Sequence, residues 1–339
     1  MTTTSNISFL GQSQTQVNRL NDLRATLDDL QRQATTQKKF ENFSGFGTDA
    51  LNLQRLHNSS TLKQAYVSNI DAASNRMTLM NTSMTEIIKV GQDIITTIQN
   101  QAKGGQPDMQ LINQQARQGL SYVESLLNQT IDGRYIFGGS DVTTPPYSDE
   151  NILNTNFNNQ ISSWLGGGIT NAQLTATTDA FTASNLGLSG GLGAAGNVTT
   201  RIDDNLDLDY TIKADDKSIT DILNTLGYAA NLKYPDPLTD VASPTQFNDL
   251  IDHILSIGTG AVDGLNSLTQ TLASKFNLVK SIRETHTSDL GLVTTQIDKL
   301  ENADPTNVIA TMQLLQTQLQ ASYQVTRQVS QMSLVNFLN

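Results

Sequence analysis

The sequence predicts a mainly α-helical protein, with long antiparallel helical bundles or coiled coils at both ends and a smaller α+β domain inserted between them. Three observations support this. Apolar residues recur at alternating spacings of four and three across the two ends. The middle is rich in Gly, Thr, Asn and Asp, with short alternating runs. Residues 132–260 carry a net charge of −11, whereas residues 1–131 and 261–339 carry +1 and −1.

Residues 1–40 are predicted to form an N-terminal assembly arm. Two heptads of leucine make an amphipathic helix that is marginal alone in water, so we expect it to need a partner. The leucines expected at its interface are Leu20, Leu23, Leu27 and Leu30.

Residues 41–135 are predicted to begin the bundle. An apolar stripe runs through a long helix at 66–98, and only Gly91 lacks a sizeable apolar side chain. "KGGQPD" at 103–108 should break the chain before a second helix. The pair should lie antiparallel. The stripe of the first helix is Tyr66, Ile70, Ala73, Met77, Met80, Met84, Ile87, Gly91, Ile94 and Ile98.

Residues 136–260 are predicted to form an outer acidic α+β domain. The sequence from 132 to about 216 indicates strands and loops, with a half-buried strand at 205–215. A helix should begin at a capping box of Ser218 and Asp221 and end at Gly227, and a second box should use Ser243 and Gln246. Glycines at 258, 260 and 264 are expected to connect this domain to the next helix.

Residues 261–303 are predicted to return along the bundle, and residues 304–339 to form a C-terminal assembly arm. Asp304 and Pro305 suit the N-cap and first position of the last helix. From 306 to 339 the one charged side chain is Arg327, so burial between subunits is expected. The interface residues expected here are Met312, Leu315, Leu319, Tyr323, Val329, Met332, Leu334 and Phe337.

No motif supports chemistry. There is no cysteine, and the three histidines lie in separate segments. "GLGAAG" at 191–196 matches a dinucleotide fingerprint but lacks the strand before it and the helix after it. We therefore predict no enzyme, no catalytic residue, no cofactor and no metal. The absence of a basic stripe and of 18 consecutive apolar residues predicts no nucleic acid and no membrane partner.

"LLQTQLQASYQVTRQVSQMSLVNFL" at 314–338 resembles the carboxyl end of the bacterial flagellin family, including the hook-associated proteins of the hook–filament junction. "DGRYIFGGSDVTTPPYS" at 132–148 resembles the joint between the helical and outer domains of the junction proteins. Where flagellins carry a Ser-Gly, Arg-Ile, Asp-Asp stretch, this chain has "ATTQKKFENFSGFGTDALNL" at 34–53, which favours the junction protein. A filament-forming flagellin and an unrelated coiled-coil fibre or tail protein stay as alternatives.

The resemblance implies a secreted structural adaptor of the extracellular flagellum, exported through the flagellar type III apparatus. It implies contacts with copies of itself in a helical ring, with another hook-associated protein, with flagellin and with an export chaperone. At the joint, Tyr135 and Phe137 should plug the outer end of the bundle. Gly138 and Gly139 should let the backbone turn away, and Pro145 and Pro146 should stiffen the exit.

Overall fold

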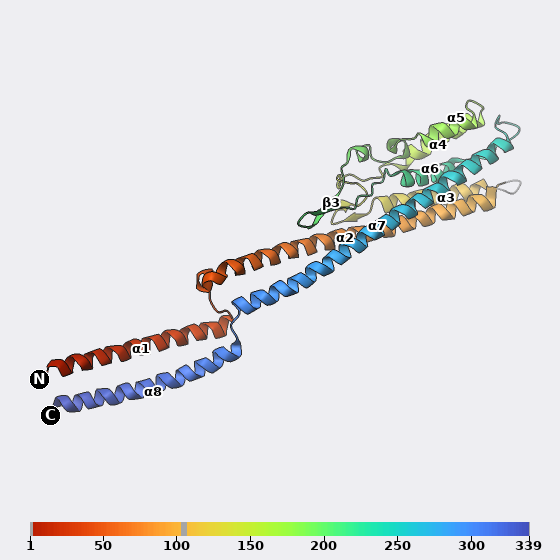
Figure 1. Ribbon diagram of the computed structural model, residues 1–339. Helices are drawn as coiled ribbons and strands as arrows, with labels where there is room; N and C mark the ends of the chain where they lie inside the picture. The colour runs from red at the N-terminus through yellow and green to blue at the C-terminus, as the bar shows by residue number, and fades with distance from the viewer. Residues whose placement is uncertain (1–2, 103–106, 339) are drawn as a thin grey trace. The chain divides into compact units, whose positions relative to one another are not determined.

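The computed structural model describes residues 3–102 and 107–338, with side chains described for 14–102 and 107–328. The predicted fold class is confirmed: long helices occupy both ends of the chain, and small antiparallel strand pairs occur in the inserted part (Figure 1). The chain divides into two compact units. The first comprises Met1–Gln64 and Thr287–Asn339, and the second comprises Ala65–His286. The finer division into five parts stays a prediction.

The first unit is built on two long terminal helices, α1 (Thr3–Thr36) and α8 (Pro305–Leu338). They lie side by side and antiparallel, so the two chain ends are adjacent (Figure 1). The predicted cap of α8 is present, because the Asp304 carboxylate accepts the backbone N–H of Thr306 at 2.9 Å. A short 3-10 helix at Phe43–Asp49 follows α1.

A backbone clamp closes the base of the terminal pair. The N–H of Lys39 donates to the carbonyl of Glu301, and the N–H of Ala303 donates to the carbonyl of Gln37, each at 2.9 Å. Lys38 forms an ion pair with Glu301, whose other carboxylate oxygen lies 3.1 Å from Nε2 of His57. The segments that enter and leave the pair are thus held to each other.

The second unit packs parts of α2 (Ala50–Ala102) and α7 (Pro244–Glu301) with α3 (Met109–Leu127) and α6 (Lys217–Asn231). The break predicted at 103–108 falls between α2 and α3. The predicted stripe of α2 is buried along its whole length. Gly91 interrupts the stripe because α6 approaches there: an added Cβ would lie 2.6 Å from Cδ1 of Ile222.

The strands form two hairpins. β1 (Thr130–Ile131) pairs with β2 (Arg134–Tyr135) across a two-residue turn, Asp132-Gly133, with φ values of 52° and 72°. Positive φ at both positions is the signature of a type I′ turn. β3 (Thr199–Asp203) pairs with β4 (Leu206–Asp209), with a bulge between Arg201 and Asp203. The strand predicted at 205–215 is therefore shorter than expected.

The expectation of only strands and loops from 132 to 216 is wrong. Two helices lie there, α4 (Glu150–Leu165) and α5 (Asn171–Asp179), together with 3-10 turns at Ala183–Leu186 and Leu192–Ala194. The many asparagines of α4 have low helix propensity. Five of its apolar residues nevertheless recur at helical spacing and are buried, so packing determines the structure. They are Leu153, Phe157, Ile161, Trp164 and Leu165.

Two predicted helix boundaries are also wrong. Gly227 lies inside α6, where an added Cβ would lie 2.4 Å from the ring of Phe157. The glycines at 258, 260 and 264 lie inside α7, and at Gly264 an added Cβ would lie 2.3 Å from Oγ of Ser218. Gly227 and Gly264 therefore serve close packing, not chain termination. The cap of α6 is Asp216, two residues before the predicted Ser218. The Ser243–Gln246 box is present as predicted.

Candidate assembly interface and domain joint

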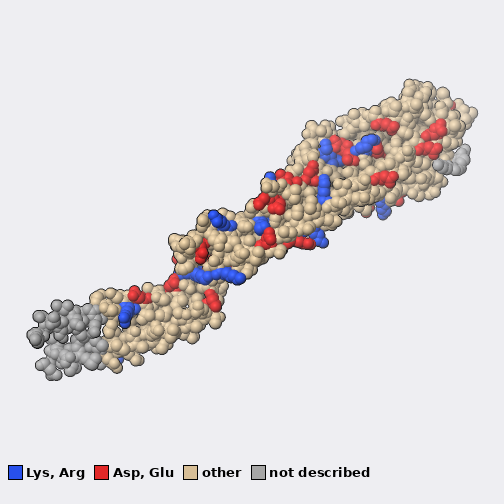
Figure 2. Space-filling view, viewed as in Figure 1, with Lys and Arg blue, Asp and Glu red and all other residues tan. Residues whose placement is uncertain are grey.

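The terminal pair brings the predicted leucines of α1 against α8. Leu20, Leu23, Leu27 and Leu30 are all half-buried. On α8, Leu315 and Leu319 are buried and Met312 is half-buried. Figure 2 shows mostly uncharged atoms over the described part of this pair. Val329, Met332, Leu334 and Phe337 lie outside the residues whose side chains are described.

Tyr323 differs from the other predicted interface residues because 44% of it is exposed. Its hydroxyl accepts a hydrogen bond from Nε of Arg24 at 2.8 Å, and the guanidinium carbon lies 5.5 Å from the ring centroid. This is a hydrogen bond combined with a cation–π contact. Tyr323 therefore lies at the edge of the seam, where Arg24 covers part of its ring.

A second apolar face of α8 was not predicted from the sequence. Leu314 and Val325 are 59% and 51% exposed, and the exposed Ala321 lies between them at helical spacing. These residues flank the seam, because Ala321 and Val325 line a shallow hollow together with Arg19 and Leu20 of α1. The signal for this face was present in the sequence as the near absence of charge on α8. The first unit thus leaves one apolar face of α8 uncovered.

At the domain joint, Phe137 is completely buried and Tyr135 is half-buried. The carbonyl of Phe137 accepts the N–H of Ala214 at 3.0 Å. The carbonyl of Tyr135 accepts Nη2 of Arg76 at 2.7 Å. The segment after β2 is therefore tied both to α2 and to the chain that leads into α6.

Gly138 and Gly139 hold backbone positions that a side chain would disturb. A Cβ at Gly138 would lie 2.2 Å from the carbonyl oxygen of Asp141. Gly139 has φ of 62°, in the left-handed region that favours glycine, and a Cβ there would lie 2.9 Å from the carbonyl oxygen of Gly196. At both glycines the close approach is to backbone carbonyl oxygens, of Asp141 and of Gly196.

Pro145 is exposed, whereas Pro146 is buried and its carbonyl accepts the N–H of Ser189 at 2.9 Å. Next to them, Asn128 makes two 2.9 Å hydrogen bonds to the backbone N–H and carbonyl of Tyr147. Burial raises the pKa of Tyr147, and the charges of Glu150, Glu124 and Asp149 add to the effect. Sequence reasoning missed Asn128 and Tyr147, although an asparagine just after α3 is a common cap.

A further contact holds the β3–β4 hairpin against the long helices. His286 of α7 is buried, and its Nε2 donates to the carbonyl of Ile202 at 2.9 Å. Its ring stacks on Tyr66 with centroids 5.3 Å apart, and the Tyr66 hydroxyl donates to Asp204 at 2.8 Å. Arg283 of α7 pairs with Asp71 of α2 in the same region. No histidine pattern in the sequence indicated the contact to Ile202.

Across residues 3–102 and 107–338, no group of three or more His, Cys, Asp or Glu side chains is placed to hold a metal ion. In the same residues, no helix is both apolar enough and long enough to cross a membrane. The glycines of the "GLGAAG" match lie in a 3-10 turn and a loop.

Comparison with known proteins gives one family match and two structural likenesses. Residues 259–338 match the bacterial flagellin C-terminal helical region. The structure of a flagellar hook-associated protein from Vibrio parahaemolyticus aligns with a TM-score of 0.53 at 11% identity, covering 75% of this chain and 97% of that one. FlgL of Bacillus cereus aligns over 74% and 96% of the two chains at 13% identity, but its TM-score of 0.39 is too low to establish a common fold.

No curated protein matches the sequence. The fold of the Vibrio protein and the match at 259–338 were found independently, and both agree with the resemblance carried by residues 314–338. The predicted resemblance is therefore confirmed for the C-terminal part of the chain: residues 259–338 match the bacterial flagellin C-terminal helical region, and the fold is similar to that of a flagellar hook-associated protein.

Proposed function

We propose that this chain is a structural adaptor of the bacterial flagellum, in the role of hook-associated protein 3. It would join the hook, through another hook-associated protein, to the flagellin filament. The flagellin-type C-terminal region and the shared fold support this role. The segment at 34–53 supports it further, because it forms a 3-10 helix with exposed phenylalanines in place of the flagellin stretch.

The uncovered face of α8 is the observation that carries the proposal. α1 covers Leu315 and Leu319 of α8, whereas Leu314 and Val325 beside them remain more than half exposed. Fully burying one such side chain contributes roughly 1.5–3 kcal/mol. Because α8 carries one charged residue, Arg327, few charges would have to be desolvated when a neighbour covers this face. Copies of the chain in a helical ring would supply that cover.

The same reasoning gives the remaining partners and the location. Assembly outside the cell follows from a flagellar role, with export through the flagellar type III apparatus. An export chaperone that covers the C-terminal helix would protect its apolar faces before assembly. The joint at Tyr135–Pro146 would then fix the direction in which the outer domain leaves the bundle.

The proposal is tested with Leu319→Asp, because Leu319 is 6% exposed and faces the seam. A carboxylate there should abolish assembly while residues 65–286 stay folded. The measurement is electron microscopy of a strain that carries the variant, in which hooks should form without filaments. Circular dichroism of the purified variant reports the fold.

Gln320→Asp is the matched control, since it places the same charge one residue along on an exposed position. It should leave filaments intact. Normal filaments with Leu319→Asp would contradict the proposal. Long filaments formed by the purified wild-type chain alone would instead indicate a flagellin, and a stable trimer in solution would indicate an unrelated coiled-coil fibre.

A further inference from the structure

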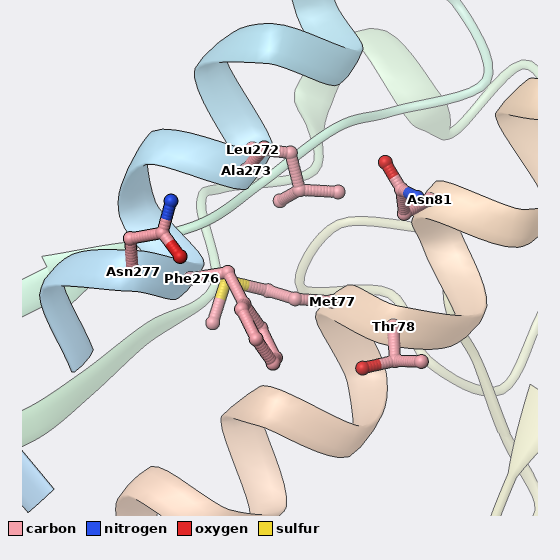
Figure 3. A pocket seen from close by; sticks show the side chains of 7 residues that line it. All are labelled: Met77, Thr78, Asn81, Leu272, Ala273, Phe276 and Asn277. Carbon is pink, nitrogen blue, oxygen red and sulfur yellow. The ribbon is translucent and has the colours of Figure 1, made fainter. Parts of the chain in front are cut away.

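An open apolar groove lies between α2 and α7 within the second unit (Figure 3). Its volume is about 260 Å³, several times the roughly 30 Å³ that one water molecule takes up. Leu272 and Asn81 point toward one another across it in Figure 3. No charged side chain lines the groove, and Met77 and Leu272 are almost fully buried beside it. The lining is Met77, Thr78 and Asn81 from α2 with Leu272, Ala273, Phe276 and Asn277 from α7.

The second unit also presents an apolar side chain that contacts little of its own chain. Leu238 is 91% exposed, the highest value among the large apolar residues of the described chain, and the nearby Val241 is 71% exposed. Leu238 sits on a closed turn rather than on a loose loop. The Asp236 carbonyl accepts the N–H groups of Thr239 and Asp240 at 3.1 and 2.8 Å.

The two carboxylates of this turn accept further hydrogen bonds from its backbone. Asp236 accepts the N–H of Leu238 at 2.9 Å, and Asp240 accepts the N–H of Asp236 at 2.8 Å. The turn is therefore ordered before any partner arrives, so docking would lose little conformational entropy. It offers one apolar side chain between two negative charges.

The groove has the complementary charge. Residues 72–85 of α2 and 264–283 of α7 contain no acidic residue. They carry Arg76, Lys275, Lys280 and Arg283, in a chain whose net charge is −11. Arg283 pairs with Asp71 and Arg76 donates to the carbonyl of Tyr135, so the two lysines of α7 supply the positive charge beside the groove. Lys280 follows Phe276 and Asn277 by one helical turn, so it lies on the groove side of α7. An acidic turn with a central leucine matches this site in both polarity and charge.

We propose that the 236–240 turn of one copy docks in the α2–α7 groove of a second copy, with Leu238 between Met77 and Phe276. In the structure Leu238 is exposed and the groove is open, so both halves of the contact are available to another copy. The 236–240 turn and the α2–α7 groove are different surfaces of the chain. The contact is therefore heterologous and can repeat from copy to copy. This inference rests on the proposed assembly of copies and adds a contact outside the terminal pair.

The chain has no cysteine, which makes disulfide capture a direct test. Full-length Leu238→Cys is mixed with full-length Asn277→Cys at high concentration under mild oxidation. Denaturing gels without reductant then measure the dimer that contains one copy of each. Docking would hold the two thiols next to each other, so we expect at least tenfold more mixed dimer than in the controls.

The controls use exposed positions of the same unit, away from the turn and the groove. Leu278→Cys replaces Asn277→Cys, because Leu278 is 47% exposed and lies on the other side of α7. Ile152→Cys, at a residue 40% exposed, replaces Leu238→Cys. Leu238→Asp, paired with a cysteine at the neighbouring Thr239, should lose the crosslink to Asn277→Cys that Thr239→Cys alone retains. All these substitutions are at exposed residues, so the fold should be kept.

A parallel mixture of Leu314→Cys copies reports on the terminal pair. Capture at Leu314 with no excess at Leu238–Asn277 would overturn this inference and leave the proposed function standing. Capture at Leu238–Asn277 alone would support the inference and contradict assembly through α8. No excess of crosslinked dimer at either site would overturn both the proposed function and this inference. Excess crosslinked dimer at both sites would support both claims.

Discussion

The terminal pair and the helical core of the second unit are built from the same apolar periodicity, yet they differ in completeness. In the core, the stripe of α2 from Tyr66 to Ile98 is buried along its whole length because α3, α6 and α7 cover it. In the terminal pair, each helix has one partner, and Leu20 to Leu30 are only half-buried. Periodicity predicts that a helix forms. The number of neighbours decides whether that helix is stable within one chain.

Hydrogen exchange gives the largest contrast. In a verified monomer, amides at 305–328 should open at a small fraction of the free energy needed at 70–98, where opening approaches the global value of about 5–15 kcal/mol. Mass spectrometry after deuterium labelling measures both segments in one experiment. Equal protection of the two segments in a dilute monomer would show that the terminal pair is as stable as the core. Protection that segment 305–328 gains only on assembly would show that neighbouring copies supply the missing stability.

Phe137→Ala tests the core side of the comparison. The ring is 0% exposed, so its loss should reduce the free energy of unfolding by about 3–5 kcal/mol. Phe43→Ala is the matched control, because Phe43 is 53% exposed in the first unit and should change stability by no more than about 0.5 kcal/mol. Chemical denaturation followed by circular dichroism measures both. Equal effects would mean that Phe137 does not plug the bundle.

Substitution of two glycines of α7 by alanine should change the stability of the protein in opposite directions. Gly264→Ala forces a Cβ against Ser218 of α6 and should destabilise the protein by about 1–3 kcal/mol. Gly260→Ala meets no atom within 4 Å and should stabilise the helix by about 0.5–1 kcal/mol. Thermal unfolding compares the two directly. A stable Gly264→Ala variant would show that α6 and α7 do not approach as described.

The smallest effect concerns the clamp at the base of the terminal pair. Burial acts to raise the pKa of Glu301, but hydrogen bonds and charges from Lys38 and His57 outweigh it and hold that pKa below its usual 4.5. The contribution of Glu301 is therefore present above pH 4.5 and is lost as pH falls through the lower, folded-state value.

Glu301→Gln should accordingly cost up to about 1 kcal/mol at pH 7, and less as the solution is acidified below pH 4.5. Unfolding curves at several pH values give the difference, and the exposed Glu41→Gln serves as the control. A difference that grows on acidification would have the wrong sign for this ion pair.

Much of the fold could be predicted because long apolar stripes and caps are local signals. The stripe of α2, the Ser243–Gln246 box and the Asp304 cap all follow from spacing alone. α4 was missed because its asparagines have low helix propensity. Its helix is stabilised by buried residues such as Phe157 and Trp164, whose burial depends on the contact with α6. Gly227 and Gly264 were misread because a packing glycine and a terminating glycine look alike in sequence.

The candidate site divides in the same way. The seam leucines and the turn at Gly138–Gly139 were accessible from the sequence, since each is a local pattern. The second face of α8, the Asn128–Tyr147 bonds and the His286–Ile202 contact were not predicted, because each depends on which elements become neighbours. Residues far apart along the chain meet there, and no window of sequence contains both partners.

The antiparallel course of α1 and α8 has a practical consequence for anyone who labels this protein. A fluorescent domain or affinity tag fused to the start of α1 would sit beside one fused to the end of α8 (Figure 1). Either fusion would therefore crowd the surface where copies are proposed to meet.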